Sequence, residues 1–334
     1  MGEVITTLNV LFKEWLNESQ LIDLLIEELK LRTRKKYDDN MHHIGFELSS
    51  LNAHYDFDKY VNEDNDIENK KLKLIFGEYM MEKMNFLDDT REKLFTDNPW
   101  LRIANEIEAK GYENPTNAVH SEDRLIVEQF NVHADDIHRL RLNLPPEPFQ
   151  GNPLNAEVVI LMLNPGFVEE CNVGKYEALD ESEQKEFIKA KCATMLMKDE
   201  LCVPENDVIN RIGEYYWKRK LKYVFKEIPD ANKKIAVVCF LGYFSTKHKA
   251  FSKKLFGGDV DLLYTQKYTI RLVRYLIREK RVIVIARAKK EWYRHIPELE
   301  SYEKKVVLKN YRNPIITQKN CEESGFELIE EALN

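Results

Sequence analysis

The sequence has few cysteines, and their spacing suits neither a disulfide framework nor a metal site. Its five cysteines are widely scattered and form no C-x-x-C pair: Cys171, Cys192, Cys202, Cys239 and Cys321. An odd number without close spacing argues against a disulfide framework and against a zinc ribbon. His42, His43 and His54 lie in a segment without clear periodicity, so we expect ordinary polar histidines. We therefore predict buried, reduced thiols and no metal.

Long apolar runs and glycine-rich phosphate loops are also absent. No apolar run reaches the roughly 18 residues of a membrane-spanning helix. The amino terminus MGEVITTLNVLFKEW has no basic region followed by an apolar segment, as a signal peptide would. Neither GxGxxG nor GxxxxGK[ST] follows the first predicted strand, which removes the main support for nucleotide-cofactor folds. We expect a cytoplasmic protein without a cofactor and without a membrane partner.

The net charge of −7 conceals a segregation of charge along the chain. Residues 211–320 carry 27 Lys and Arg against 10 Asp and Glu, a balance of +17, whereas residues 1–210 sum to −19. Nucleic acid is the commonest partner of such a basic block. The alternative is that the basic block pairs with the acidic residues across a domain interface.

Hydrophobic periodicity divides the chain into two predicted domains. Residues 1–95 look helical, as in LNVLFKEWLNESQLIDLLIEELK, where apolar residues recur at helical spacing. Residues 96–334 alternate strands with helices, which predicts an α/β domain with a parallel sheet covered on both faces. The predicted strands are four, at 157–163, 234–241, 281–286 and 304–308. The predicted helices are at 181–198, 207–227, 266–279 and 288–296.

The first of these strands stops abruptly at a turn signal. The run EVVILML reads as a strand buried on both faces, and Asn164-Pro165-Gly166-Phe167 follows it directly. Proline cannot donate to a sheet ladder, so the chain must leave the sheet here. An amide side chain is then held at the carboxyl end of the strand, where open α/β sheets bind ligands.

A second Asn-Pro pair, Asn313-Pro314, follows the last predicted strand in the segment NYRNPIITQKN. Together the two motifs resemble those of the uracil-DNA glycosylase superfamily, over roughly residues 97–330. The resemblance implies a uracil-DNA glycosylase-like fold in which the first motif positions a water and the second clamps the base and the DNA backbone. Two departures are Leu163, where a small residue is usual, and Ile315, which replaces a serine and leaves Thr317 as the nearest hydroxyl.

The resemblance and the chemistry of glycosidic cleavage assign roles to the residues at this edge. Asn164 is expected to orient the attacking water through its carbonyl oxygen, and Asn313 to contact the departing base or the abasic sugar. The expected base pocket comprises Pro165, Gly166, Phe167, Tyr243 and Ser245, although Phe167 could equally be a core aromatic. The expected DNA contacts are His248, Arg287, Lys289, Lys290, Arg312, Thr317 and Lys319.

The segment EYYWKRKLKYVFKE, 214–227, interleaves aromatic and basic residues. One interpretation is a stripe of Tyr216, Lys220, Tyr223 and Lys226 that tracks a nucleic-acid strand by stacking and charge. The other is an amphipathic helix with Trp217, Leu221, Val224 and Phe225 in the core, in which the lysines still face DNA.

The function that these observations favour is a monofunctional DNA glycosylase that flips a damaged or modified base out of single- or double-stranded DNA and leaves an abasic site. No lysine follows the pattern of a Schiff-base nucleophile. The helical amino-terminal extension and the departures from the motifs suggest a specialised role. Some members of the superfamily are antiphage enzymes that remove bulky modified cytosines from phage DNA, and we expect such a role here. The alternatives are a non-catalytic nucleic-acid-binding protein with a glycosylase-like fold and an unrelated α/β enzyme acting on a nucleotide or a phosphorylated small molecule.

Overall fold

The structure is a computed structural model that describes residues 89–110, 118–205, 208, 215–251 and 262–334. The chain divides into two units, Met1–Asn85 and Phe86–Asn334, and every described residue belongs to the second. The helices predicted before residue 89, with His42, His43 and His54, lie outside the described residues. The predicted boundary at residues 95 and 96 cuts through α6 (Arg91–Thr96), whose Leu94 is fully buried in the core of the second unit.

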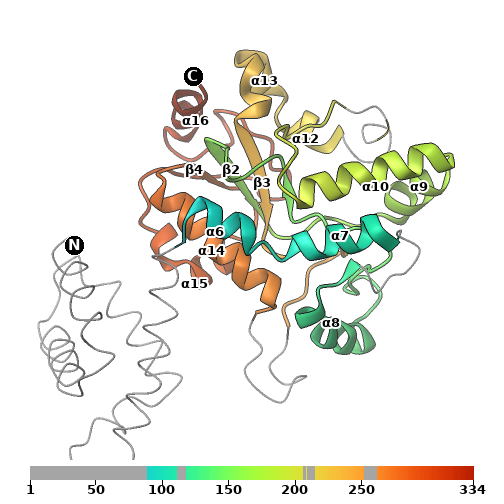
Figure 1. Ribbon diagram of the computed structural model, residues 1–334. Coiled ribbons are helices and arrows are strands. Elements are labelled where there is room, and N and C mark those ends of the chain that lie inside the picture. The colour runs from blue at the N-terminus through green and yellow to red at the C-terminus, as the bar shows by residue number, and fades with distance from the viewer. Residues whose placement is uncertain (1–88, 111–117, 206–207, 209–214, 252–261) are drawn as a thin grey trace, which may run out of the picture. The chain divides into compact units, whose positions relative to one another are not determined.

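The second unit is an α/β domain built on a five-stranded sheet (Figure 1). The sheet order is β1-β3-β2-β4-β5. The strands are β1 (Phe149–Gln150), β2 (Val158–Met162), β3 (Ile235–Cys239), β4 (Val282–Ile285) and β5 (Lys305–Val307). The four predicted strands are confirmed, and they run parallel to one another.

The prediction of a four-stranded sheet is wrong, because β1 adds an antiparallel edge strand. Phe149 pairs with Val238 and Gln150 with Val237. Two residues between Pro148 and Gly151 show no alternation that a sequence pattern could reveal, and proline is tolerated at a sheet edge. Gly151 ends the strand at a φ of +69°, where an added Cβ would lie 2.9 Å from the carbonyl oxygen of Ile235.

Helices surround the sheet along the rest of the domain. Before β1 lie α6, α7 (Trp100–Lys110) and α8 (Ser121–His133). Between β2 and β3 are a π-helical turn (Glu170–Gly174), α9 (Lys175–Glu177), α10 (Glu181–Met195), α12 (Tyr215–Lys220), α13 (Lys222–Glu227) and a 3₁₀ turn (Pro229–Lys233). The remaining elements are α14 (Tyr264–Arg278), α15 (Lys289–His295), a 3₁₀ turn (Pro297–Leu299) and α16 (Gly325–Leu333).

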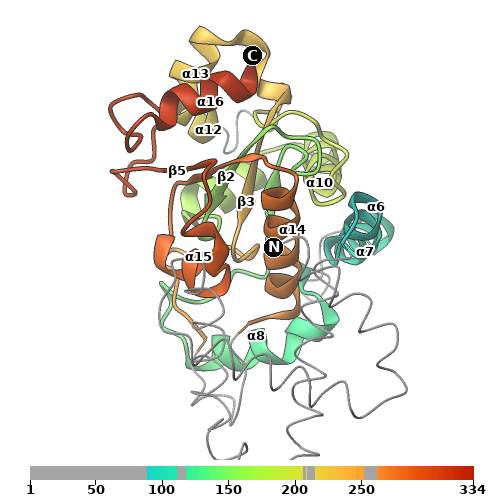
Figure 2. The same cartoon turned by 90° about the vertical axis from the view of Figure 1, so that its left-hand side faces the viewer.

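Alternate residues of each parallel strand enter two separate cores. In β2, Val159 and Leu161 pack on one face, whereas Val158, Ile160 and Met162 pack on the other. The first face is covered by α7, α10, α14 and α15, and the second by α12, α13 and α16, as two views of the ribbon show (Figures 1 and 2). Double coverage explains why the strands read as continuous apolar runs.

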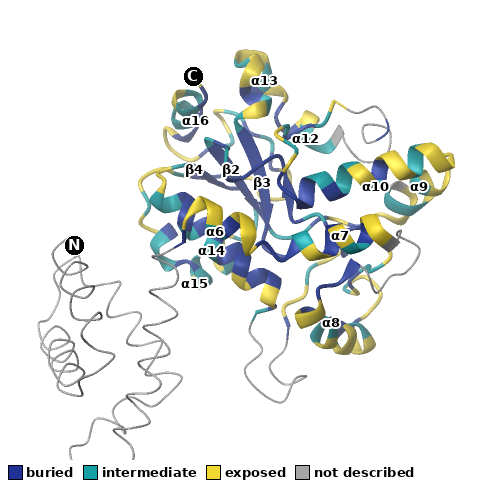
Figure 3. Cartoon of the chain, viewed as in Figure 1, coloured by how far each residue is buried: buried dark blue, intermediate teal, exposed yellow. Residues whose placement is uncertain are grey.

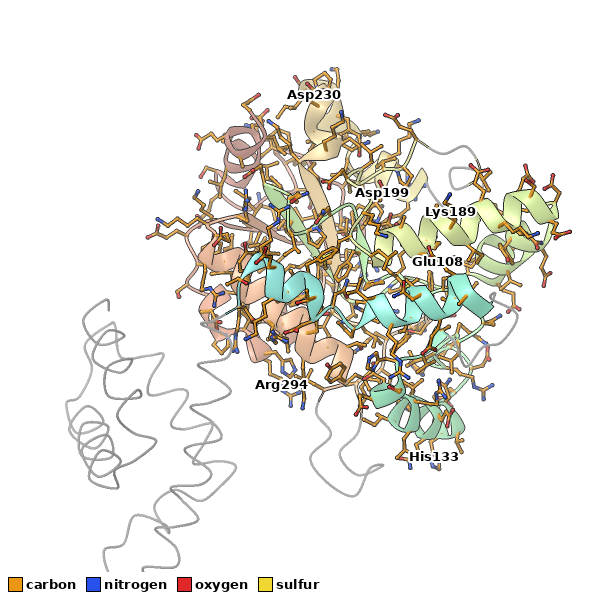
Figure 4. The ribbon with its side chains drawn as sticks, viewed as in Figure 1. Glu108, His133, Lys189, Asp199, Asp230 and Arg294 are labelled. Atoms are coloured by element: carbon orange, nitrogen blue, oxygen red, sulfur yellow. The ribbon has the colours of Figure 1, made fainter. Side chains whose placement is uncertain are left out.

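Burial follows the same layers (Figure 3). The strands are buried along their lengths, and exposed residues lie on the outer sides of the helices. Lys189 of α10 and Arg294 of α15, both labelled in Figure 4, are exposed charged residues of this kind. No helix within the described ranges is long and apolar enough to cross a bilayer.

Four cysteines confirm the expectation of reduced, buried thiols: Cys192, Cys202, Cys239 and Cys321 are free and buried. Burial raises the pKa of the Cys192 thiol to about 12 and that of Cys321 to about 11. A thiol with such a pKa is protonated at neutral pH and a poor nucleophile. Among the described side chains, these cysteines therefore contribute packing rather than chemistry.

Candidate active site at the carboxyl edge of the sheet

The winding of the sheet reverses at its central strand, β2. The chain passes from β2 to β3 on one side and then crosses to β4 on the other, so that β2 and β4 are neighbours with connections leading in opposite directions. Ligands of open α/β sheets bind at the carboxyl ends of the strands at such a switch point. Asn164 follows β2 and Arg287 follows β4, and the backbone N–H of Arg287 donates to the carbonyl of Leu161 at 3.2 Å.

Asn164 is held with its amide in one orientation. Its Nδ2 donates to the carbonyl oxygen of Pro165 at 2.9 Å and to Oγ of Ser245 at 3.0 Å. The Pro165 carbonyl can only accept, and the Ser245 hydroxyl already donates to the carbonyl of Lys247. The NH₂ group must therefore face these partners. The carbonyl oxygen Oδ1 has no protein donor among the described residues and is left to bind water.

The turn after Asn164 is buried on one side and open on the other. Pro165 is buried, whereas Gly166 is exposed, and a Cβ added there would meet no atom within 4 Å. Phe167 is only 5% exposed and packs with Leu144 and Phe244. The guanidinium of Arg141 lies 4.7 Å above the Phe167 ring. Phe167 therefore corresponds to the core-aromatic alternative, and the open surface beside Asn164 is at Gly166.

Ser245 and Tyr243, expected in the base pocket, both point into the protein. Ser245 is 1% exposed and orients Asn164 as described above. Tyr243 is also 1% exposed, and its hydroxyl donates to Oδ2 of Asp123 at 2.9 Å and accepts from the backbone N–H of His120 at 3.2 Å. Both hydroxyls therefore have protein partners, which makes Ser245 a positioning residue for Asn164 and Tyr243 a link between α8 and the end of β3.

His248 is a neutral residue in this structure. Burial, and the neighbouring His138, lower the pKa of the His248 imidazole to about 4, so that it carries no charge at neutral pH. The phosphate contact predicted for His248 would then be a hydrogen bond without charge attraction.

Arg287, Lys289 and Lys290 occupy the turn from β4 into α15. Arg287 is half-buried, and its Nη2 donates to the carbonyl oxygen of Arg312 at 3.2 Å. Ala288 takes a left-handed conformation with a φ of +58° and is the N-cap of α15. Lys289 and Lys290 are exposed, and within the described part of the chain neither forms an ion pair. Their position suits the phosphate contacts predicted for them, which stay a prediction.

The second Asn-Pro motif lies in a loop after β5 that its own side chains hold in place. The backbone N–H of Asn313 donates to Oδ1 of Asn310 at 3.1 Å, and the N–H of Asn320 donates to the Thr317 hydroxyl at 3.2 Å. Thr317 is thus a turn residue. Arg312, Asn313 and Lys319 are exposed.

Asn164 and Asn313 lie at the same edge of the sheet without touching. Strand β4 separates β2 from β5, so the carboxyl ends of β2 and β5 lie two strand spacings apart, about 10 Å. Arg287, which follows β4, donates to the carbonyl oxygen of Arg312 in the loop of Asn313.

Lys220 is buried beside Asn313, a position that neither interpretation of its helix predicted. The structure breaks the helix predicted over 207–227 at Leu221, and Leu221 and Val224 are buried as the amphipathic interpretation predicts. Lys220, assigned to an outward stripe, is 5% exposed, and its Nζ contacts Oδ1 of Asn313 at 2.5 Å. Helical spacing could have predicted the burial of Lys220. It lies three residues after Trp217 and four before Val224, and residues at that spacing share one face of a helix.

Because the Tyr243 hydroxyl is buried and hydrogen-bonded, we expect its removal to destabilise the domain. Replacing Tyr243 with Phe removes a hydrogen bond to a buried carboxylate whose pKa burial raises, and this should lower the free energy of unfolding by about 1–3 kcal/mol. The control Tyr223→Phe, at an exposed position, should change it by less than about 0.5 kcal/mol. Urea unfolding measures both. Unchanged stability with altered DNA binding would place Tyr243 in the pocket instead.

Comparison with known proteins identifies no relative of this chain. No protein-family model matches the chain, and neither curated proteins nor solved structures give a match. The resemblance to glycosylases therefore rests on the sequence motifs alone.

Proposed function

We propose that the protein is a monofunctional DNA glycosylase whose active site lies at the switch point between β2 and β4. The observation that carries the proposal is the fixed amide of Asn164, which leaves its carbonyl oxygen free at the edge where such sheets bind ligands. A carbonyl oxygen accepts a hydrogen bond from a water molecule, and this bond can orient the lone pair of the water oxygen toward the reacting carbon. An amide cannot act as a base near neutral pH, so its role is placement.

Cleavage of an N-glycosidic bond suits such a site. The sugar gains positive charge and the base negative charge as the bond breaks, so the reaction needs a placed water and stabilisation of the leaving base. Asn164 would supply the first and the loop of Asn313 the second. The approach to the site is open at Gly166, where backbone and nucleotide could come close.

The charge distribution supports DNA as the partner. Several cations at this edge are exposed and lack an ion-pair partner among the described residues: Lys218, Arg219, Lys289, Lys290, Arg312 and Lys319. Part of the basic block does pair with the acidic half, as in Arg271 with Asp89 at 2.5 Å and Arg281 with Glu157. The unpaired cations are the ones that could release counterions from DNA.

The proposal is tested by a substrate screen. Purified protein is incubated with DNA carrying uracil, hypoxanthine, T·G mismatches or phage-type modified cytosines, including glucosylated hydroxymethylcytosine, and abasic sites are measured. Abasic sites from one of these bases support the glycosylase. Salt-dependent binding without abasic sites would favour the non-catalytic alternative, and the absence of both would favour the unrelated enzyme.

Replacing Asn164 with Ala should abolish base excision while leaving the fold and most DNA affinity intact. The change removes water placement but no phosphate contact, and a loss of more than tenfold corresponds to more than about 1.4 kcal/mol of transition-state stabilisation. Single-turnover excision, a binding titration and a melting curve of the same variant measure these effects. A variant that keeps more than a tenth of the wild-type rate would mean that another residue places the water.

Replacing Ser245 with Ala should lower kcat with little change in KM. The hydroxyl is the side-chain partner that fixes the Asn164 amide, so its loss lets the carbonyl oxygen turn away from the water. The control is Thr246→Ala, an exposed neighbour that bonds nothing at the site. Steady-state kinetics separates the two parameters, and equal kcat values for the two variants would contradict this role.

Replacing Lys289 and Lys290 together with Gln should weaken binding to all DNA sequences alike. Each phosphate neutralised on duplex DNA adds about −0.9 to the slope of log affinity against log salt, so the slope should flatten by up to about 2. The control is Lys185→Gln, since Lys185 is already paired with Glu181. A lower melting temperature with unchanged binding would instead favour charge pairing within the protein.

A further inference from the structure

Lys220 is a buried cation at the carboxyl edge with an unusual set of neighbours. It is the last residue of α12, is 5% exposed, and its Nζ lies 4.9 Å from the centre of the Tyr216 ring. Its Nζ donates to Oδ1 of Asn313 at 2.5 Å, which joins α12 to the loop after β5. Its backbone carbonyl accepts from the N–H of Ile316, in the same loop.

No carboxylate balances this charge within the described part of the chain. The charged groups that face Lys220 are cations: Arg219 on its own helix and Arg287 at the end of β4. Burial, and then these two guanidinium groups, lower the pKa of the Lys220 ammonium. A buried cation without a counterion is costly. The burial of this lysine therefore carries a cost that its contacts with Asn313 and the Tyr216 ring must offset.

The lysine decides the orientation of the Asn313 amide. An ammonium group only donates, so the atom that faces it must be the carbonyl oxygen. The backbone of Asn313 is already engaged, because its N–H bonds Asn310 and its carbonyl accepts from Ile315 at 2.7 Å. The NH₂ group of Asn313 has no acceptor among the described residues, and the positive charge of Lys220 polarises it as a donor.

The two asparagines of the site thus present opposite groups. Asn164 has its NH₂ group bound to the protein and offers an acceptor, whereas Asn313 has its oxygen bound and offers a donor. A hydrolysis that needs one acceptor for water and one donor for a departing anion would use this pair.

We propose that Lys220 is a positioning residue that fixes the Asn313 amide as a hydrogen-bond donor to the negative charge developing on the departing base. This inference rests on the proposed glycosylase function. Lys220 acts through Asn313 and its positive charge, and it forms no bond to the substrate.

Two variants and a matched control test this role in excision. Lys220→Met should lower kcat at least about tenfold with KM little changed, because it removes stabilisation that matters in the transition state. Lys220→Arg should restore most of the rate, since guanidinium also only donates. The control Lys222→Met removes another lysine that lies over a tyrosine ring, Tyr223 at 4.6 Å, in the next helix. Equal effects of the two Met variants would overturn the proposal.

The pH dependence provides a readout that a purely structural role would not move. When the Lys220 ammonium group loses its proton, it becomes a neutral amine that can accept a hydrogen bond. The wild-type kcat should therefore fall as the pH rises through the pKa of Lys220, which lies below 10.5. With Lys220→Arg this alkaline decline should move above pH 10.5, because guanidinium stays protonated. An unchanged decline in the Arg variant would contradict the assignment.

A measurement without DNA separates this proposal from the glycosylase proposal. The side-chain NH₂ signal of Asn313 in ¹⁵N-asparagine-labelled protein, assigned by its loss in Asn313→Asp, is followed from pH 7 to 11. We expect it to shift with the deprotonation of Lys220 and to stay fixed in Lys220→Met. A titrating signal in a protein that excises no base would refute the glycosylase while retaining the lysine–amide coupling. A signal that ignores Lys220 would overturn the coupling itself.

Discussion

The central strand β2 is the constraint on which the rest of the domain depends. It is hydrogen-bonded to β3 and β4 along both edges and buried on both faces, so neither its register nor its direction can change alone. Because the winding reverses at this strand, its carboxyl end opens between two connections that lead away from it. The turn Asn164–Gly166 occupies that opening.

The site combines a rigid support with exposed polar groups. Ser245 and the Pro165 carbonyl accept from the NH₂ group of Asn164, and Lys220, the last residue of α12, donates to the amide oxygen of Asn313. Each amide has its orientation decided by the donor or acceptor character of its partner, not by its own chemistry. Such preorganisation is what electrostatic catalysis needs, since no reorientation is then required during the reaction.

The parallel strands, and the position of Asn164 just beyond the carboxyl end of β2, could be predicted because they depend on local pattern. The apolar run Val158–Met162 predicts the strand, and Asn164-Pro165-Gly166 predicts where it ends. The edge strand β1 could not be predicted, because two residues are too few to show an alternation of apolar and polar side chains. The role of Tyr243 could not be predicted from the sequence either, because its hydrogen-bond partner Asp123 lies 120 residues away along the chain. Lys220 shows an intermediate case, in which helical spacing placed it on the buried face but its charge suggested solvent.

In the proposed mechanism, a nucleotide binds between Asn164 and Asn313. The most direct test is a crystal structure of the protein with duplex DNA that contains one tetrahydrofuran abasic-site analogue, a probe that does not depend on the identity of the excised base. We expect the tetrahydrofuran ring to lie at the carboxyl ends of β2 and β4, with the Asn164 carbonyl oxygen facing it and the Asn313 NH₂ group beside the vacated base position. An analogue bound on another face of the domain, with both amides remote from the DNA, would contradict it.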